Sequence, residues 1–344
     1  MSGSSLDGLD IAYCHFEKNS TGWKYKIMDT VTLPFPTELE EMLRKIASLQ
    51  PEKFVKADHQ LGEFMGKSVN KFITGNNIKN IDYIASHGHT AFHNPEEKYT
   101  CQIGNGFSIA IESGITTISD FRSLDIALGG QGAPLVPIGD QLLFNNYTFC
   151  LNLGGYSNIS FELDEKRIAF DICPVNKIIN YLARQLNKNY DHNGDIAKYG
   201  KINPSLLSSL NDLDYYKKVA PKSLGDNWLN NIFMPALHNF EISIPDKLRT
   251  LYEHISNQVA KATNNYKEGK ILTTGGGAHN QFLIECIQSQ NKHELVLPDK
   301  KLVDFKEALI FALMGVLKIE NSVNCLSSVT GASRDNTGGI IHQV

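Results

Sequence analysis

The segment NLGGYSNIS, residues 152–160, decides the fold. Strand-like runs over 148–153 and 159–163 flank a turn made of glycine, serine and asparagine, so the sequence predicts a strand, a turn and a second strand. The backbone N–H groups of such a turn can bind an anion. One turn of this kind is weak evidence, because most glycine turns only reverse the chain.

Two more turns of the same kind occur in the chain. Gly3-Ser4-Ser5, with Asp7, comes before a strand predicted over 11–16, and Gly275-Gly276-Gly277 precedes a helix predicted over about 280–287. The first two turns each head one half of the chain, which indicates phosphates held between paired domains. The third turn then suits a base and ribose. We therefore expect the ligand to be a nucleotide.

Length and composition favour an ordinary globular protein. A chain of 344 residues is expected to form two domains, and a net charge of -4 gives no reason to expect nucleic acid or an acidic membrane as partner. The apolar stretch 308–317 is too short to cross a membrane and predicts a buried helix. No signal-peptide pattern is present and the six cysteines form no C-x-x-C pair, so we expect reduced thiols in a cytoplasmic protein.

Hydrophobic periodicity organises the first half. Strands are predicted over 11–16 and 23–33, and a capping-box pattern at Thr37 opens a helix that runs to about residue 49. An amphipathic helix is predicted over about 54–73, and a short strand over 81–85.

The second half repeats this plan in outline. A strand over 167–170 carries Asp171 at its end, and a helix follows over 176–186. Each half thus pairs a β-hairpin that bears a polar turn with later strand–helix units. The glycine-dense segment 127–137 is a plausible boundary between them.

Three other patterns are interpreted as structural. Residues 62–68 resemble a phosphate-binding loop, but they have one residue too few between the glycines and lie in a predicted helix. His87, His89 and His93 could share one face of a strand, but no carboxylate or cysteine ligand is near, so a metal is disfavoured. Cys173 is interpreted as a packing residue rather than a nucleophile.

Taken together, these segments resemble the anhydro-N-acetylmuramic acid kinases, which belong to the actin, Hsp70 and sugar-kinase superfamily. The matching segments run nearly from end to end: MSGSSLDGLD (1–10), SHGHTAFHNP (86–95), SDFRSLDIALGGQGAPLVP (119–137), NLGGYSNIS (152–160), FDICPVN (170–176), YDHNGDIAKYG (190–200), PKSLG (221–225), TTGGGAHN (273–280), DFKEALIFALMG (304–315) and VTGAS (329–333). The GGQGAPLVP and GGGAHN portions are the most specific.

The resemblance implies an α/β protein with the two-domain, actin-like (duplicated ribonuclease H-like) fold and an active-site cleft between the domains. Domain I would comprise residues 1–136, with about 323–344 returning to it, and domain II residues 137–322. The implied reaction is the ATP-dependent, hydrolytic opening of 1,6-anhydro-N-acetylmuramic acid with phosphorylation of O6. The product would be N-acetylmuramic acid 6-phosphate, formed in cell-wall sugar recycling. The family also leads us to expect a homodimer.

The resemblance also implies roles for individual residues. By position alone, Asp171 could be either a general base at the crevice or the N-cap of the next helix, and the family match favours the base. Arg122 would either contact the sugar or brace the cleft with Asp120. The remaining implied roles are outer-phosphate binding by Gly3, Ser4 and Ser5; Mg²⁺ binding by Asp7, through water; phosphate closure by Gly154, Gly155 and Asn158; adenosine contact by Gly275, Gly276, Gly277 and Asn280; and sugar contact by Thr90 and Glu307.

The sequence departs from the family on the sugar side. The usual Asp-Thr-Gly-Pro-Gly-Asn motif reads DICPVN at 171–176, which should narrow or reshape the pocket, and a glutamine is replaced by His89, which can become charged near neutral pH. Two alternatives therefore stay open: a kinase of a different (anhydro)sugar, or a non-catalytic ATP-binding regulator. The family also has a hydrophobic strand before the first turn, where Met1 stands here. We expect that adding about six to eight residues upstream would raise ATP affinity or turnover.

Overall fold

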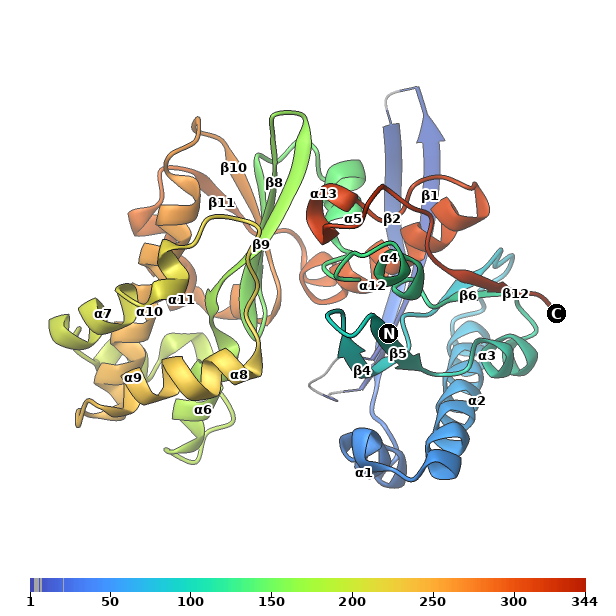
Figure 1. Ribbon diagram of the computed structural model, residues 1–344, viewed down its shortest axis with the longest axis horizontal. Helices are drawn as coiled ribbons and strands as arrows, with labels where there is room; N and C mark the ends of the chain where they lie inside the picture. Colours follow the sequence, from blue (N-terminus) through green and yellow to red (C-terminus); the bar gives the residue numbers. More distant parts are fainter. Residues whose placement is uncertain (3–5, 7, 21) are drawn as a thin grey trace. The chain divides into compact units, whose positions relative to one another are not determined.

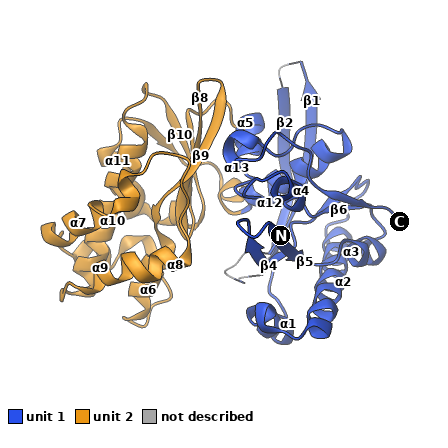
Figure 2. Ribbon diagram, in the orientation of Figure 1, with its two compact units in different colours: residues 1–143, 305–344 blue, residues 144–304 orange. Residues whose placement is uncertain are grey.

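The computed structural model describes residues 1–2, 6, 8–20 and 22–344 (Figure 1). The chain divides into two compact units (Figure 2): unit 1 contains residues 1–143 and 305–344, and unit 2 contains residues 144–304. From the sequence, we expected the boundaries between the two domains at 136/137 and 322/323. The units differ from this because α5 (Pro137–Leu143) and most of α12 (Lys300–Ile319) pack within unit 1.

The described residues of unit 1 form three small sheets. The strands β1 (Leu9–Asn19) and β2 (Gly22–Leu33) form an antiparallel pair, which confirms both predicted strands and lengthens the first. A second pair is β4 (His89–Asn94) with β5 (Tyr99–Ile103). The third sheet has the order β12 (Ile340–His342), β6 (Thr117–Ser119) and β3 (Ile84–Ala85). Of the strand predicted over 81–85, only its last two residues are in β3.

The helices of unit 1 include the two that the sequence predicted near its start. The capping box at Thr37 is wrong, because Thr37 is already helical and Pro36 is the N-cap without a side-chain bond. The helix expected over 54–73 is α2 (Pro51–Gly75), and it contains the P-loop-like residues. The unit 1 helices besides α2, α5 and α12 are α1 (Thr37–Arg44), α3 (Gly106–Ser113), α4 (Ser123–Ala127) and α13 (Ser327–Thr330).

The glycines of the P-loop-like segment serve helix packing. A Cβ atom on Gly62 would lie 2.7 Å from the carbonyl oxygen of Asn105, and one on Gly66 would lie 2.5 Å from the Cβ of Glu112. Both contacts involve α3 or its N-cap, so the two glycines let α2 and α3 approach closely.

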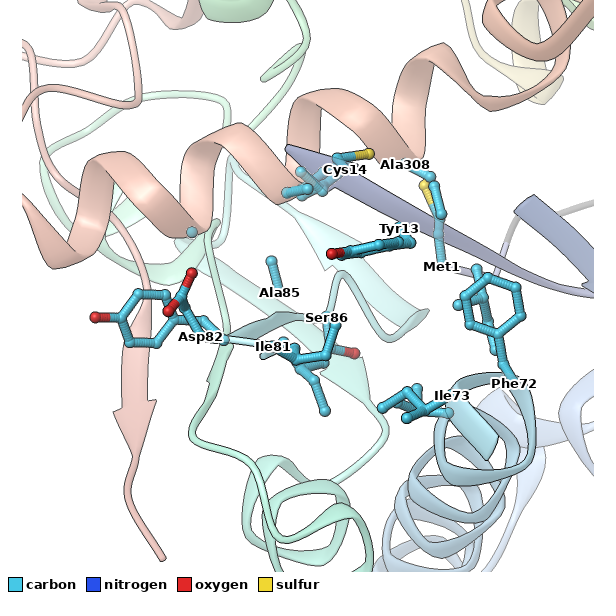
Figure 3. A pocket seen from close by; sticks show the side chains of 18 of the residues that line it. Met1, Tyr13, Cys14, Phe72, Ile73, Ile81, Asp82, Ala85, Ser86 and Ala308 are labelled. Atoms are coloured by element: carbon cyan, nitrogen blue, oxygen red, sulfur yellow. The ribbon is translucent and has the colours of Figure 1, made fainter. Parts of the chain in front are cut away.

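A cavity of about 330 Å³ lies inside unit 1 (Figure 3). It is lined by β1, the C-terminal part of α2, residues 78–86 and one side of α12. Thr90, Arg122 and Glu307 are not among the described residues that line it. This cavity is therefore distinct from the sugar-contact residues that the sequence predicted.

Unit 2 is built on one five-stranded sheet. Its order is β11 (Glu294–Val296), β10 (Lys270–Thr274), β7 (Phe149–Leu153), β8 (Tyr156–Leu163) and β9 (Lys166–Pro174). β10 runs parallel to β7 and β11, while β7, β8 and β9 form an antiparallel meander. The strand–turn–strand prediction around 152–160 is confirmed, but β8 begins at Tyr156, so Asn158 lies in the second strand and not in the turn.

The sheet packs against a helical layer that includes α10 (Figure 1). Leu251, Tyr252 and Ile255 of α10 are fully buried in one core cluster with Leu151 and Ile159 of the sheet. The α-helices of unit 2 are α6 (Asn176–Arg184), α7 (Pro204–Asn211), α8 (Asp226–Trp228), α9 (Met234–His238), α10 (Ile244–Thr263) and α11 (Gln281–Gln290). Short turns of other helix types lie at Ile46–Ser48 in unit 1 and at His192–Gly194, Ala197–Tyr199, Asp214–Lys217, Leu229–Phe233 and Gly276–His279 in unit 2.

The apolar stretch 308–317 forms part of α12, as expected. Leu309, Leu313 and Met314 are completely buried there, so this stretch is a core helix. Across the part of the chain that the structure describes, no helix is both long enough and apolar enough to cross a membrane.

Candidate functional site

A row of polar residues crosses four strands of the unit 2 sheet. Thr274 of β10 pairs with Asn152 of β7, Asn152 pairs with Asn158 of β8, and Asn158 pairs with Asp171 of β9. Directly paired residues point to the same face of a sheet. The structure therefore brings together Asn158 and Asp171, which the sequence had placed in the phosphate site and the catalytic site.

Asp171 lies within β9 and not at its end, which corrects the prediction. The strand continues to Pro174 because Cys173 pairs with Ser157, and Ile172 is the extra residue of a bulge. The N-cap of α6 is Val175, so the alternative role of Asp171 as a helix cap is wrong. Its carboxylate faces the same side as Asn158.

Backbone and side-chain contacts hold Asp171 in place. Its N–H donates to the carbonyl oxygen of Lys222 at 3.2 Å, and its own carbonyl accepts from the hydroxyl of Tyr215 at 2.6 Å. The carboxylate oxygen Oδ2 accepts from the N–H of Leu224 at 2.8 Å. Burial raises the pKa of Asp171, and the hydrogen bond from Leu224 opposes that rise. A carboxylate more basic than usual is better suited to take a proton from water.

The second glycine turn is fastened to the start of α6. The carbonyl of Gly155 accepts from the N–H groups of Val175 at 2.9 Å and Lys177 at 3.3 Å, and the carbonyl of Gly154 accepts from Asn176 at 3.2 Å. The carbonyls of both glycines are thus bound on the side of the turn that faces α6.

The third glycine turn lies beside the second. Gly275 has φ of +85°, and a Cβ there would lie 2.3 Å from Oδ1 of Asn152. A Cβ on Gly154 would lie 3.1 Å from Nδ2 of the same Asn152. Asn152 was not among the predicted site residues, and its one signal in the sequence is its place at the end of a strand, two residues before a glycine turn. One side chain therefore lies against both turns.

Asn280 has structural partners in this structure. Its Oδ1 accepts from the N–H of Leu283 at 3.1 Å as the N-cap of α11, and its Nδ2 donates to the hydroxyl of Tyr252 at 2.6 Å. The predicted contact of Asn280 with adenosine stays a prediction. The first turn, with Gly3, Ser4, Ser5 and Asp7, lies outside the described residues.

Arg122 forms hydrogen bonds with His87 and Gly132, and not with Asp120 as the sequence suggested. Its guanidinium donates to Nε2 of His87 and, at 2.6 Å, to the carbonyl oxygen of Gly132. The carboxylate of Asp120 instead accepts from the N–H of Ser123 at 3.2 Å. Bracing by Arg122 is therefore directed at His87 and the glycine-dense segment, not at Asp120.

Thr90 and Glu307 also lie in unit 1. Thr90 is exposed on β4, where its hydroxyl accepts from Nε2 of Gln102 at 3.4 Å. Glu307 lies about two turns into α12 rather than at its start, because Asp299 caps the helix by accepting from the N–H of Leu302. Partial desolvation raises the pKa of Glu307 and Arg122 opposes the rise. Water reaches the Glu307 side chain, so screening limits this shift.

The three histidines near Thr90 have separate partners. His87 accepts from Arg122, Nδ1 of His89 contacts Oγ of Ser2 at 3.1 Å, and Nδ1 of His93 contacts Oγ1 of Thr100 at 3.0 Å. Burial lowers the pKa of His89, which keeps its ring neutral at pH 7. Within the described ranges, no group of three or more histidine, cysteine, aspartate or glutamate side chains could hold a metal ion.

The altered residues after Asp171 pack into the core. Ile172, Cys173 and Val175 are at most 3% exposed and belong to the core cluster of unit 2. Their side chains point into this core, so they do not narrow a pocket directly, and the expectation that they reshape it stays a prediction. Burial raises the pKa of Cys173 to about 12, consistent with a packing residue.

The chain is similar to one family along nearly its whole length. The family model described as anhydro-N-acetylmuramic acid kinase matches residues 1–343. The chain is 34% identical to the anhydro-N-acetylmuramic acid kinase of Mannheimia succiniciproducens, covering 99% of this chain and 97% of that protein. It is 32% identical to the Vibrio cholerae protein of the same description, covering 99% and 96%.

Solved structures give a weaker similarity. The activator of the 2-hydroxyisocaproyl-CoA dehydratase from Clostridium difficile with bound ADPNP matches with a TM-score of 0.40 and 12% identity, covering 87% of this chain and 92% of that one. A ROK family glucokinase from Streptomyces griseus matches with a TM-score of 0.35 and 10% identity, covering 83% and 93%. TM-scores this low support no inference about this chain.

Proposed function

Because the chain belongs to the anhydro-N-acetylmuramic acid kinase family, we propose that it uses ATP to open 1,6-anhydro-N-acetylmuramic acid and to phosphorylate its O6. The observation that carries this proposal is the row in which Asp171 lies beside Asn158 on one face of the unit 2 sheet. A carboxylate with a raised pKa next to a glycine turn suits a base that works close to a nucleotide.

The proposed reaction breaks the C1–O6 bond of the sugar and forms one new bond at each of these two atoms. Water attacks C1, the C1–O6 bond breaks, O6 forms a bond to the γ-phosphorus, and ADP leaves. Asp171 takes the proton of the attacking water. The product is N-acetylmuramic acid 6-phosphate with a new hydroxyl at C1.

All three glycine turns would hold the nucleotide. The close contact between Gly275 and Asn152 leaves no room for a side chain, as expected where a backbone must approach a ligand. Gly154, Gly155 and Asn158 would bind phosphate oxygens, and Gly275, Gly276, Gly277 and Asn280 would contact adenosine. Mg²⁺ would arrive with ATP and neutralise charge on the phosphates, with Asp7 holding it through water and Gly3, Ser4 and Ser5 binding the outer phosphates.

Residues of unit 1 would bind the sugar. Thr90 and Glu307 offer a hydroxyl and a carboxylate that can bond to sugar hydroxyls. Arg122 can pair with the carboxylate that muramic sugars carry. Its orientation is fixed beforehand by His87 and Gly132, which lowers the cost of ordering it.

The proposal is tested by product analysis. The protein is incubated with Mg-ATP and, separately, 1,6-anhydro-N-acetylmuramic acid, 1,6-anhydro-N-acetylglucosamine and N-acetylmuramic acid. We expect ADP release with the first sugar and a product whose mass equals substrate plus water plus one phosphoryl group. Turnover confined to another sugar would support the kinase of a different sugar, and ATP binding without turnover would support the regulator. A homodimer and a cytoplasmic location stay predictions.

A further inference from the structure

Asp226 joins both sides of the second glycine turn. Its Oδ1 accepts a hydrogen bond from the hydroxyl of Tyr156 at 2.8 Å and forms an ion pair with Nζ of Lys177. Tyr156 follows Gly155 directly in the chain, and the N–H of Lys177 donates to the carbonyl of Gly155. The ammonium of Lys177 also lies 4.9 Å from the ring centre of Tyr156. We call these three side chains the Asp226 cluster.

The segment that ends at Asp226 also contacts the candidate base. Leu224 donates its N–H to Oδ2 of Asp171, and the carbonyl of Lys222 accepts from the N–H of Asp171. Residues 222–226 therefore contact Asp171 at their start and in their middle, and Asp226 at their end contacts Tyr156 and Lys177 beside the glycine turn.

Polar contacts are the main anchors of this segment. None of the residues 221–226 is buried, and a Cβ on Gly225 would meet nothing within 4 Å. At the start, Nζ of Lys222 donates to the carbonyl of Tyr215 at 3.4 Å and lies 4.8 Å from the centre of its ring. At the end, the Asp226 cluster is the corresponding anchor. A segment without a buried side chain is expected to move more freely when such an anchor is lost.

We propose that Asp226 is a positioning residue that keeps the N–H of Leu224 directed at the carboxylate of Asp171 by tying residues 222–226 to the second glycine turn. This inference rests on the proposed function for its consequence in catalysis. Asp226 touches neither the sugar nor the reacting atoms in the mechanism above. It acts through Leu224 on the base and through Tyr156 and Lys177 on the turn.

The direction in which the pKa of Asp171 moves distinguishes a positioning role of Asp226 from a direct effect of its charge. The hydrogen bond from Leu224 lowers the pKa of Asp171, so its loss raises that pKa. Removal of a neighbouring negative charge would by itself lower the pKa of a carboxylate. The other groups that face Asp171 or its strand are Tyr156, Tyr215, Cys173 and Lys222. Burial raises the pKa of the two tyrosines and Cys173, so they are neutral near pH 7, and Lys222 is shared by every variant below.

The first test measures kcat against pH for the full chain with Mg-ATP and the anhydro-sugar. Asp226→Ala should move the acid limb of the kcat profile to higher pH by about one unit, which corresponds to the energy of one hydrogen bond to a charged group. Tyr156→Phe, which changes no charge, should have the same effect. Asp226→Glu should restore part of the shift. The matched control is Asp214→Ala, which removes another exposed carboxylate paired with a lysine, Lys217, and should leave the limb in place. An unchanged or lowered limb in Asp226→Ala would overturn the proposal.

A second test needs no turnover. Hydrogen exchange of the peptide that covers Leu224 should become faster in Asp226→Ala and stay unchanged in Asp214→Ala. Equal exchange in wild type and Asp226→Ala would overturn the positioning claim, whatever the activity. Faster exchange in a protein that phosphorylates no anhydro-sugar would support the positioning of Asp171 while the proposed function fails.

Discussion

Arg122 donates two hydrogen bonds to one acceptor, Nε2 of His87, from Nε at 3.2 Å and from Nη2 at 2.7 Å. His87 can accept them because burial and the positive charge of Arg122 hold its pKa well below the usual range, so the ring is neutral. A third hydrogen bond, from Nη1 to Gly132, fixes the plane of the guanidinium. This side chain is therefore oriented before any ligand binds.

Replacing Arg122 by lysine tests that orientation. A lysine keeps the charge but cannot make the forked contact with His87, so Arg122→Lys should raise KM for the sugar about tenfold while KM for ATP stays the same. Steady-state kinetics with each substrate varied in turn measure this. Arg44→Lys, at an exposed ion pair on α1, is the control and should change neither value. An equal rise in both KM values would remove Arg122 from the sugar site.

The third glycine turn is tested by a pair of alanine variants. Gly275 and Gly114 both have positive φ, but a Cβ would meet Asn152 at Gly275 and nothing within 4 Å at Gly114. Alanine at Gly114 bears a backbone penalty of about 1–2 kcal/mol in the left-handed helical region, and alanine at Gly275 one of about 1–3 kcal/mol in a region that is nearly restricted to glycine. Only Gly275→Ala also displaces Asn152 from the two turns. Calorimetric titration with a non-hydrolysable ATP analogue should show at least about tenfold weaker binding for Gly275→Ala. Unchanged affinity would argue against nucleotide binding at this turn.

Part of the site could be predicted from the sequence because its signals are local. Glycine turns after strand-like runs, and the 3.6-residue pattern of α2, depend on neighbours in the chain. Asn158 was singled out by such a turn, whereas the role of Asp171 as a base came from the resemblance to the kinase family.

The remaining features depend on contacts between distant segments. The bulge at Ile172, which carries β9 past Asp171, follows from pairing with β8 and leaves no local signal. The Asp226 cluster joins residues 156, 177 and 226, which no spacing rule connects. Asn152 was missed because its importance comes from lying against Gly275, more than a hundred positions later in the chain.

His254 should make unit 2 sensitive to acid. Its ring is fully buried, with Nδ1 2.8 Å from Oδ1 of Asn211 and Nε2 3.0 Å from the hydroxyl of Tyr216, and burial lowers its pKa to about 3. The unfolded chain takes up this proton near pH 6.5, so stability falls as pH drops from about 6.5 toward 3, by up to about 1.4 kcal/mol per pH unit. The free energy of unfolding, measured with urea from pH 7 to 4, should change less with pH in His254→Gln than in wild type. The control is His192→Gln, at an exposed site, which should behave like wild type. The same pH dependence of the free energy of unfolding in all three proteins would contradict this assignment.

Asp171→Asn tests the candidate base. The amide oxygen can still accept from Leu224, so the fold and ATP affinity should be kept, while kcat should fall on the order of 10²–10⁴ because an amide cannot take a proton from water. Thermal unfolding with and without the ATP analogue checks the fold and the nucleotide site. Normal turnover in Asp171→Asn would end its assignment as the base.

The fate of the water oxygen tests the central claim most directly. The protein is given 1,6-anhydro-N-acetylmuramic acid and Mg-ATP in ¹⁸O-water, the sugar is reduced at once to stop exchange at C1, and the product is fragmented in a mass spectrometer. Unlabelled N-acetylmuramic acid 6-phosphate in the same water corrects for exchange. We predict one heavy oxygen at C1 and none in the phosphate group. A phosphorylated sugar that keeps its anhydro bridge, or heavy oxygen found only in phosphate, would contradict the account.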